Sequence, residues 1–417
     1  MAAGSSLAGL RHTEGMDADV VVIGAGALGL STALHAALAG RSVTIIERDT
    51  AGSQASGRAA GLFKSVQADE LRTRLARRSI ARARSFEDWA GVPLAVASPG
   101  SYLIARTSAH KQFLGIEHRQ SRSWGVDVHE APVPALSYYH GDGSERALWC
   151  PEDIYIEEPA DLVRAYVAAA ERHGVRLLEH EAATDITLSG GRVTGVETTS
   201  RTIAAPVVVD AAGAWVRQVA ELAGGRVAVA PVRHQLLITE QSADVDPADP
   251  IIRVVDAAVY LRPARRGLMV GGFEAAPLAV DPGDEHASFR TEDLELDLAV
   301  LRKLAAPVAA EVPLAADAPV AEHRGGLFTM TPDGRFIAGP LPDLPGLWVA
   351  SGCNGSGFSS SLGIGEALAA WICSAPDRLD ISPLSPGRFG ALTDDALIAD
   401  GRWQYAHYYD PGADGQT

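Results

Sequence analysis

Short apolar runs recur along the chain and predict strands that are buried on both faces. These runs are DVVVI at 19–23, SVTII at 42–46, APVVVD at 205–210 and GLWVAS at 346–351. Continuous runs of this length, rich in β-branched residues, are typical of parallel sheets. An Ala/Leu-rich segment at 30–38 predicts a helix between the first two runs. Residues 19–47 therefore predict a strand–helix–strand unit.

The rest of the pattern predicts further helices and a second type of sheet. Between 232 and 273 the pattern turns to alternating apolar and polar positions, which predicts an antiparallel sheet with one covered face. Residues 175–178 and 193–198 are expected to be strands around a hairpin turn at Gly190-Gly191. Gly/Ser-rich loops are expected at 52–61 and 352–363. The segments predicted to be helices are 69–90, 160–173, 292–305 and 364–373.

Composition narrows the class of protein without choosing its fold. The 417 residues carry 36 Lys and Arg against 52 Asp and Glu, and the net charge of -16 argues against nucleic acid or an anionic membrane surface as a partner. Three scattered cysteines suit neither a disulfide framework nor a zinc site, so we expect no metal and a cytoplasmic location. No apolar run approaches the roughly 18 residues that span a bilayer. Residues 1–16 lack the features of a signal peptide and are expected to be a disordered leader.

A glycine motif, Gly24-x-Gly26-x-x-Gly29, lies between the first predicted strand and the first predicted helix. Such glycines allow, in order, a tight turn, a close approach of main-chain N–H groups to a pyrophosphate, and close packing of helix on strand. The helix N-terminus adds partial positive charge. Glu47 ends the second strand, where a carboxylate accepts hydrogen bonds from a ribose diol and would repel a 2′-phosphate. The unit predicts a dinucleotide site that disfavours NADP.

Further segments resemble the FAD-dependent D-amino acid oxidase, glycine oxidase and sarcosine oxidase family. The resemblance spans roughly residues 17 to 375 and keeps the family order, and its last segment is the most specific. A weaker segment, YLRPARRGLMVGGFE, is similar to the substrate sheet of this family. The four main segments are DADVVVIGAGALGLSTALHAALAGRSVTIIERD, GSQASGRAAGLF, VVVDAAGAW and TPDGRFIAGPLPDLPGLWVASGCNGSGFSSSLGIGEALAAWI.

The resemblance implies an α/β fold in which a Rossmann-like FAD-binding domain is interleaved with an antiparallel-sheet substrate domain. The FAD-binding domain would comprise 17–91, 151–226 and 326–390, the substrate domain 92–150 and 227–325, and a C-terminal tail 391–417. The residues expected to contact FAD are Gly24, Ala25, Gly26, Ala27, Leu28, Gly29, Glu47, Arg48, Ser53, Ser56, Arg58, Ala60, Gly61, Leu62, Ala183, Ala212, Gly213, Trp215, Gly339, Asn354, Gly355, Ser356, Gly357, Phe358 and Ser359.

Departures from the family pattern qualify what the resemblance implies. Where covalently flavinylated members have a linking Cys or His, this chain has Gly326 or Arg58, so we expect non-covalent FAD. Met269 takes the place of a Lys that speeds the reaction of reduced flavin with oxygen. Ser359 and Phe328 take the places of basic residues that hold the substrate carboxylate. Both a simple amino acid substrate and oxygen as oxidant therefore remain open.

The candidates for the substrate end come mainly from the alternating segment. Tyr260 and Arg262 are two apart on a predicted strand and should share a face toward the flavin. His234 and His323 are possible bases, although a histidine satisfied within the fold is the simpler interpretation. The cations that could hold an anion are Lys64, Arg233, Arg262 and Arg324. The residues predicted to contact the substrate or act on it are Tyr260, Arg262, Lys64, Asn354, Ser356 and Met269.

The resemblance implies an oxidoreductase that acts on the CH–NH bond of a secondary amine or amino acid. In this reaction a hydride passes to flavin N5 and the imine is then hydrolysed in water. Oxygen or a protein electron acceptor would take the electrons. Two alternatives remain open: an FAD-dependent 2-hydroxy acid dehydrogenase, and a flavin-bound assembly or partner subunit.

Overall fold

The computed structural model describes residues 16–283 and 288–410 and has the mixed α/β architecture that the sequence predicts. A six-stranded sheet has the strand order β18-β19-β12-β1-β2-β8. Neighbouring strands pair in parallel except β18, which is antiparallel to β19. The strands are β1 (Val20–Ile23), β2 (Val43–Ile46), β8 (Arg176–Leu178), β12 (Val207–Asp210), β18 (Ile337–Pro340) and β19 (Leu347–Ser351).

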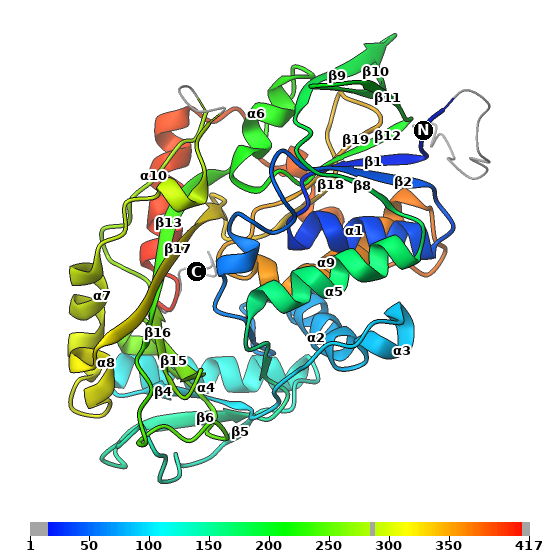
Figure 1. Cartoon of the computed structure of the whole chain (residues 1–417). Coiled ribbons are helices and arrows are strands. Elements are labelled where there is room, and N and C mark those ends of the chain that lie inside the picture. The colour runs from blue at the N-terminus through cyan, green and yellow to red at the C-terminus, as the bar shows by residue number, and fades with distance from the viewer. Residues whose placement is uncertain (1–15, 284–287, 411–417) are drawn as a thin grey trace.

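Both faces of this sheet are covered, which explains its continuous apolar runs. Val20 and Val22 pack toward the helices on one face, whereas Val21 and Ile23 pack toward the opposite face. Figure 1 shows α1, α5 and α9 side by side along the first face. The helices on and near this face are α1 (Ala27–Leu38), α2 (Glu70–Arg84), α3 (Phe86–Ala90), α5 (Pro159–Arg172) and α9 (Gly357–Ile372).

Helix α9 begins seven residues before its predicted start at 364 and takes in the second part of the predicted loop 352–363, from Gly357 on. Glycine and serine are poor helix formers alone, but small side chains let α9 lie against its neighbours. A Cβ at Gly363 would lie 2.2 Å from the Leu75 carbonyl oxygen of α2, and one at Gly365 would lie 2.2 Å from Ser31 Oγ of α1. The predicted helix 69–90 also differs, because it is broken at Ser85 into α2 and α3.

The second face of the six-stranded sheet is covered by a small antiparallel sheet and by α6 (Val216–Glu221). The hairpin at Gly190-Gly191 is confirmed, but the strand predicted at 175–178 is not part of it. That strand is β8, which pairs with β2. The small sheet consists of β9 (Ala183–Ser189), β10 (Arg192–Thr198) and β11 (Thr202–Ala204). A separate two-stranded sheet is formed by β3 (Leu62–Phe63) and β7 (Ile154–Tyr155).

An eight-stranded sheet stands beside this unit and has the order β17-β13-β16-β15-β14-β4-β6-β5. All its pairs are antiparallel except β14 with β4. Its strands are β4 (Ser101–Ala105), β5 (His129–Glu130), β6 (Arg146–Cys150), β13 (Ala230–Thr239), β14 (Ile251–Val254), β15 (Val259–Ala264), β16 (Gly267–Gly272) and β17 (Val320–Met330).

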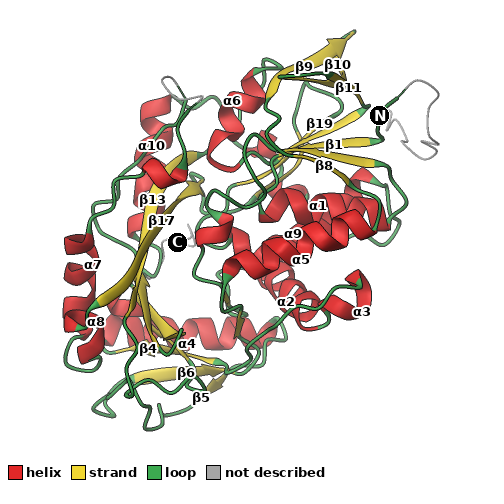
Figure 2. Cartoon of the chain, viewed as in Figure 1, coloured by secondary structure: helices red, strands yellow, loops and turns green. Residues whose placement is uncertain are grey.

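The expectation of one covered face for this sheet is wrong. Strands β13, β15 and β16 are buried at every position. Leu237 and Leu268 pack against the helices on the outer face, and Leu236 and Tyr260 belong to a cluster on the inner face. Figure 2 shows the outer helices α7 and α8 on the far side of this sheet. The helices near the sheet are α4 (Ser108–Ser123), α7 (Leu298–Ala305) and α8 (Pro313–Asp317). The helix predicted at 292–305 therefore begins later than expected, at Leu298.

The predicted C-terminal tail 391–417 contains a helix, α10 (Asp394–Ala406), which packs on β13 and β17. The approach is close because a Cβ at Gly401 would lie 2.7 Å from Ala230 Cβ. Residues 411–417 of this segment, and residues 1–15 of the predicted leader, lie outside the described residues. The segment thus belongs, through residue 410, to the folded body beside the eight-stranded sheet.

The strands divide between the two large sheets much as the predicted domain ranges would require. Strands of the six-stranded sheet come from 17–91, 151–226 and 326–390. Strand β17, however, runs through the boundary predicted at residue 326 and pairs along β13 as far as Met330. The domain division remains a prediction, and this pairing favours a boundary after Met330.

No helix in the described part of the chain is long and apolar enough to cross a membrane.

Candidate active site

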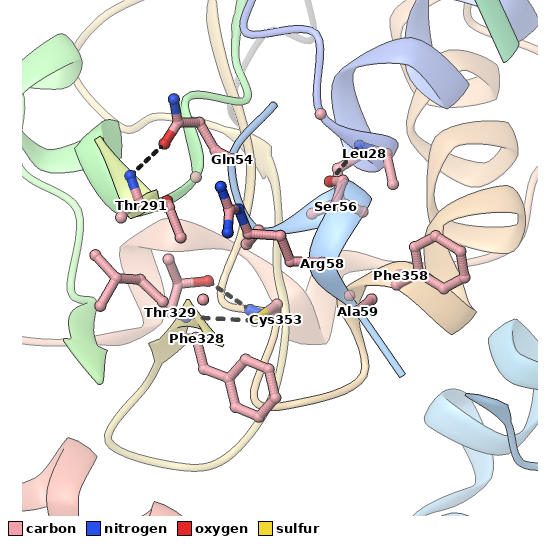
Figure 3. A pocket seen from close by; sticks show the side chains of 18 of the residues that line it. Leu28, Gln54, Ser56, Arg58, Ala59, Thr291, Phe328, Thr329, Cys353 and Phe358 are labelled. Carbon is pink, nitrogen blue, oxygen red and sulfur yellow. Dashed lines mark hydrogen bonds between the residues drawn. The ribbon is translucent and has the colours of Figure 1, made fainter. Parts of the chain in front are cut away.

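A cavity of about 530 Å³ lies between the carboxyl end of the six-stranded sheet and the inner face of the eight-stranded sheet. Ligands of open α/β sheets bind in this position. One end is lined by the glycine turn after β1, Glu47 and Trp215, and the other by Tyr260, Phe273 and Tyr408. The two ends are called here the nucleotide end and the aromatic end. Figure 3 shows part of the lining, with the Arg58 side chain projecting from the segment that also carries Ser56 toward Thr291.

The nucleotide end is built from main chain that only glycine permits. Gly24 has φ of +101°, and a Cβ there would lie 2.6 Å from the Ala211 carbonyl oxygen. A Cβ at Gly29 would lie 2.0 Å from the Gly24 carbonyl oxygen, so helix α1 can approach β1 this closely only without one. The Ala27 backbone N–H at the start of α1 donates to Ser56 Oγ at 3.0 Å. These contacts place the N-terminus of helix α1 at the cavity wall, where the partial positive charge of the helix end can attract an anionic ligand.

Glu47 is held in place by the main chain at the end of β2. Its Oε2 accepts from the Ala25 backbone N–H at 2.8 Å and its Oε1 from the Asp49 N–H at 2.9 Å. Burial raises the pKa of Glu47, and the two N–H groups oppose that rise. Each carboxylate oxygen keeps further lone pairs. The carboxylate can therefore accept hydrogen bonds from a diol at this end of the cavity.

Several polar atoms of the cavity lining are buried without any hydrogen-bond partner. Within the described residues they include Arg58 Nε, Trp215 Nε1, Gln218 Oε1 and Ser351 Oγ. Buried polar atoms in folded proteins are nearly always hydrogen-bonded, so unpaired ones along a cavity indicate a missing partner. A long ligand with donors and acceptors along its length fits this lining. The cavity residues therefore fit a dinucleotide such as FAD.

Most residues predicted to contact FAD line this cavity, and four do not. Ala25 is buried behind the turn, and Gly29 packs on Gly24. Gly339 lies on β18 beside Pro386, and the Asn354 amide is bonded to the Gly352 carbonyl. The lining residues from that prediction are Gly24, Gly26, Ala27, Leu28, Glu47, Arg48, Ser53, Ser56, Arg58, Ala60, Gly61, Leu62, Ala183, Ala212, Gly213, Trp215, Gly355, Ser356, Gly357, Phe358 and Ser359.

The aromatic end is a layered group of rings from three strands, from Phe273 just after β16, and from the C-terminal segment. Tyr408 stacks on Phe273 with ring centroids 3.9 Å apart and planes 6° apart. His234 stacks on Phe328 at 4.2 Å. The hydroxyl of Tyr260, on β15, lies 2.9 Å from His234 Nε2. Burial lowers the pKa of His234 to about 3, so this imidazole is neutral near pH 7.

Lys64 brings a positive charge to the aromatic end. Its Nζ donates to Tyr408 Oη at 2.6 Å and lies 4.5 Å from the centre of that ring. Burial tends to raise the pKa of Tyr408, but Lys64 and the Ser356 hydroxyl outweigh it and lower the pKa. Among the described cations of the lining, Lys64 alone has no carboxylate partner: Arg48 pairs with Asp49, Arg58 with Glu292, Arg253 with Asp153, and Arg324 with Glu322.

Two of the predicted substrate residues have other roles. Arg262 is fully buried outside the cavity, and its guanidinium donates to the Ala60 carbonyl at 3.1 Å, to the Glu157 carbonyl at 3.0 Å and to the Glu157 carboxylate at 3.0 Å. Met269 is buried in the inner cluster and does not line the cavity. The two-residue spacing of Tyr260 and Arg262 predicts a shared face. The Arg262 guanidinium, however, donates its hydrogen bonds to loop carbonyls and is not available to a ligand in the cavity.

Asn354 also falls outside the cavity, whereas Lys64, Tyr260 and Ser356 line it. Of the other cations considered, Arg324 lines it but Arg233 instead bonds the Glu295 carbonyl at 2.7 Å. His323 lies 3.1 Å from the Gln235 amide oxygen and is absent from the lining.

The C-terminal segment supplies residues that the sequence interpretation missed. Tyr408 and Tyr409 line the aromatic end, and Tyr405 hydrogen-bonds His234 Nδ1 at 2.8 Å. The run RWQYAHYYD at 402–410 was the available signal, because so many aromatic residues seldom lie in a solvated tail. Its position after the family-like segments gave no indication that it returns to the cavity.

A Rossmann-like dinucleotide site joined to a covered antiparallel sheet defines a class of two-part nucleotide-dependent oxidoreductase folds. The family model described as FAD dependent oxidoreductase (DAO) matches residues 19–371. The chain therefore belongs to this family of FAD-dependent oxidoreductases.

Individual proteins agree with this assignment. Sarcosine dehydrogenase, mitochondrial, of Homo sapiens is 29% identical over 395 residues, which is 90% of this chain and 42% of that protein. The formaldehyde-forming 4-methylaminobutanoate oxidase of Paenarthrobacter nicotinovorans is 29% identical over 88% of this chain and 45% of its own length. The chain thus spans less than half of these relatives. The crystal structure of L-proline dehydrogenase from P. horikoshii has a TM-score of 0.78 at 22% identity, covering 90% of this chain and 98% of that one.

Proposed function

We propose that this chain oxidises the CH–NH bond of a secondary amine or N-methyl amino acid and holds FAD without a covalent bond. The observation that carries the proposal is the aromatic end itself, where Lys64 has no carboxylate partner among the described residues and lies beside the rings of Tyr260, Phe273 and Tyr408. Such an end suits an amine that carries a carboxylate. The names of the relatives, an N-methyl amino acid dehydrogenase and a methylamino acid oxidase, support the same substrate class.

The residues of the chain would bind and orient the substrate and exclude water. Bound FAD supplies the hydride acceptor. Lys64 would attract the carboxylate, and the stacked rings would position the amine in a largely dry space. Ser356 stands at the N-cap position of helix α9, and the first residues of this helix line the cavity, where the positive end of the helix dipole would favour negative charge. Reactions of this kind need little acid–base chemistry from the protein.

Non-covalent attachment is supported by the two positions at which a linking residue would be expected. Gly326 and Arg58 both line the cavity, and neither side chain can form a stable bond to a flavin. Arg58 instead offers a buried Nε that has no protein partner. Acid precipitation of the purified protein should release all yellow colour into the supernatant. Colour retained in the pellet would contradict this part of the proposal.

Anaerobic reduction of the bound flavin is the decisive experiment for the substrate class. Secondary amines, N-methyl amino acids and 2-hydroxy acids are each mixed with the holoprotein while the visible flavin absorbance is recorded. Bleaching by an amine alone supports the proposal. Bleaching by hydroxy acids alone would favour the hydroxy acid dehydrogenase alternative, and a flavin that no compound reduces would favour a partner subunit.

We further propose that reduced enzyme passes its electrons to a separate acceptor more readily than to oxygen. Met269 takes the place of the lysine that speeds the oxygen reaction in this family, and it is buried outside the cavity. Lys64 is the only lysine among the described lining residues, and its ammonium group is hydrogen-bonded to Tyr408 at the aromatic end. Reduced enzyme mixed with aerated buffer should reoxidise slowly compared with turnover in the presence of an artificial acceptor. Reoxidation as fast as turnover would identify an oxidase instead.

A further inference from the structure

A hydrogen-bonded chain of three side chains connects the C-terminal helix with the cavity. Tyr405 Oη, on α10, lies 2.8 Å from His234 Nδ1, and His234 Nε2 lies 2.9 Å from Tyr260 Oη. His234 stands on β13 and is 6% exposed. Tyr260 lines the cavity, whereas Tyr405 is 1% exposed and lies behind the histidine. The chain therefore runs from the buried core to the substrate side.

A neutral His234 allows only two arrangements of the protons. The pKa of this imidazole is lowered by burial, so it carries a single N–H. If the proton is on Nδ1, His234 donates to Tyr405 and accepts from Tyr260. If it is on Nε2, His234 accepts from Tyr405 and donates to Tyr260. Only the second arrangement leaves the Tyr260 hydroxyl proton available to the cavity.

The surroundings of Tyr405 favour the second arrangement. Within the described residues, His234 Nδ1 is the one acceptor in hydrogen-bond reach of the Tyr405 hydroxyl. A proton on Nδ1 would leave the Tyr405 O–H buried without an acceptor, which folded proteins avoid. Tyr405 must then donate, and His234 must carry its proton on Nε2.

We propose that Tyr405 is a positioning residue that keeps the His234 proton on Nε2, so that Tyr260 donates its own hydroxyl proton to a carboxylate oxygen of the substrate. The inference rests on the proposed function, because it assigns the acceptor to an amine substrate that carries a carboxylate. Lys64 and Tyr408 stand at the same aromatic end and would share this anion. The C-terminal helix thereby takes part in substrate recognition without touching the substrate.

The histidine tautomer can be observed without any substrate. Holoprotein labelled with ¹⁵N-histidine gives distinct nitrogen signals for the two tautomers, and His234→Gln assigns the signal of His234. We expect the Nε2–H tautomer in the unsubstituted protein and a mixture in Tyr405→Phe. An Nδ1–H tautomer in the unsubstituted protein would overturn the proposal, whatever the enzyme oxidises.

Ligand binding tests the consequence for Tyr260. (Methylthio)acetate has the carboxylate of an N-methyl amino acid but no N–H to oxidise, and its binding is followed by the change in flavin absorbance. Tyr260→Phe should weaken binding about tenfold or more, because a hydrogen bond to a charged group is lost. Tyr405→Phe should also weaken binding, and the double variant should be no weaker than Tyr260→Phe alone. Multiplied losses, or a Tyr405→Phe protein that binds normally, would contradict the proposal.

A matched control separates positioning from general loss of packing. Tyr138→Phe removes one equally buried hydroxyl, which donates to the Pro250 carbonyl in the outer cluster away from the cavity. It should leave binding of (methylthio)acetate unchanged, and FAD content should be equal in all variants. If the holoprotein binds no carboxylate but amines without one still reduce the flavin, this inference fails while the oxidation of amines stands.

Discussion

The two ends of the cavity are built in opposite ways. At the nucleotide end, Gly24, Gly26 and Glu47 lie within one strand–helix–strand unit, and main-chain contacts shape the turn and hold the Glu47 carboxylate. At the aromatic end, rings from β13, β15, β17 and the segment after α10 converge from distant parts of the chain. The first end tolerates few residue types because backbone packs on backbone. The second depends on which side chains the tertiary structure brings together.

The largest effect is expected at Gly24, where a side chain meets main chain. Gly24→Ala places a Cβ 2.6 Å from the Ala211 carbonyl oxygen at φ of +101°, and should cost at least about 3 kcal/mol in the holo state. We expect protein without FAD, measured as the flavin-to-protein absorbance ratio. Gly190→Ala is the control, because its φ is +58° but no atom lies within 4 Å. Equal FAD content in both variants would show that the turn is not rigid.

Arg262 provides the next test, because it separates a structural from a substrate role. Arg262→Met removes a buried guanidinium that ties β15 to the Ala60 and Glu157 carbonyls, whereas the half-exposed Glu157 carboxylate keeps the Arg265 N–H. Because each carbonyl left without a donor costs about 1–3 kcal/mol, the loss should be about 2–4 kcal/mol of unfolding free energy, measured by denaturant titration. The KM of whatever holoenzyme remains should change little. A large rise in KM with unchanged stability would restore Arg262 as a substrate residue.

Lys64 should have a smaller effect on stability and a clear effect on binding. Lys64→Met removes the lining cation for which the described part of the chain offers no carboxylate partner. For an anionic amine the KM should rise about tenfold to a hundredfold, as expected for a lost bond between charged groups. Lys303→Met, at an exposed position on α7, is the matched control. An unchanged KM in Lys64→Met would mean that the carboxylate binds elsewhere.

The smallest expected effect is a pH dependence of several-fold. Tyr408 loses its proton as pH rises through its pKa, which lies below the usual value for tyrosine because Lys64 and Ser356 outweigh burial. The phenolate then neutralises Lys64 and repels the substrate carboxylate, so KM should rise on the alkaline side. Tyr408→Phe should remove this rise. The same alkaline limb in Tyr408→Phe would assign the titration to another group.

The accuracy of the sequence interpretation follows the same division. The turn at Gly24 and the strands around it could be predicted, because each glycine answers to a local backbone requirement. Arg262 was placed at the site from its strand spacing to Tyr260, which gives a shared face but not the distance to a ligand. Met269 was placed there only by the family resemblance, and it is buried in the inner cluster. Tyr405 and Tyr408 could not be placed, because nothing local indicates where a C-terminal helix docks.

The sequence by itself determined the dinucleotide unit, the buried parallel strands and the family, since these depend on residues close together in the chain. Only the tertiary structure decided which side chains form the aromatic end. It paired Arg253, Arg324 and Arg262 with carboxylates and left Lys64 beside Tyr408. The physical reason is that a cation's role depends on the partners within a few ångströms, and long-range packing brings those partners there.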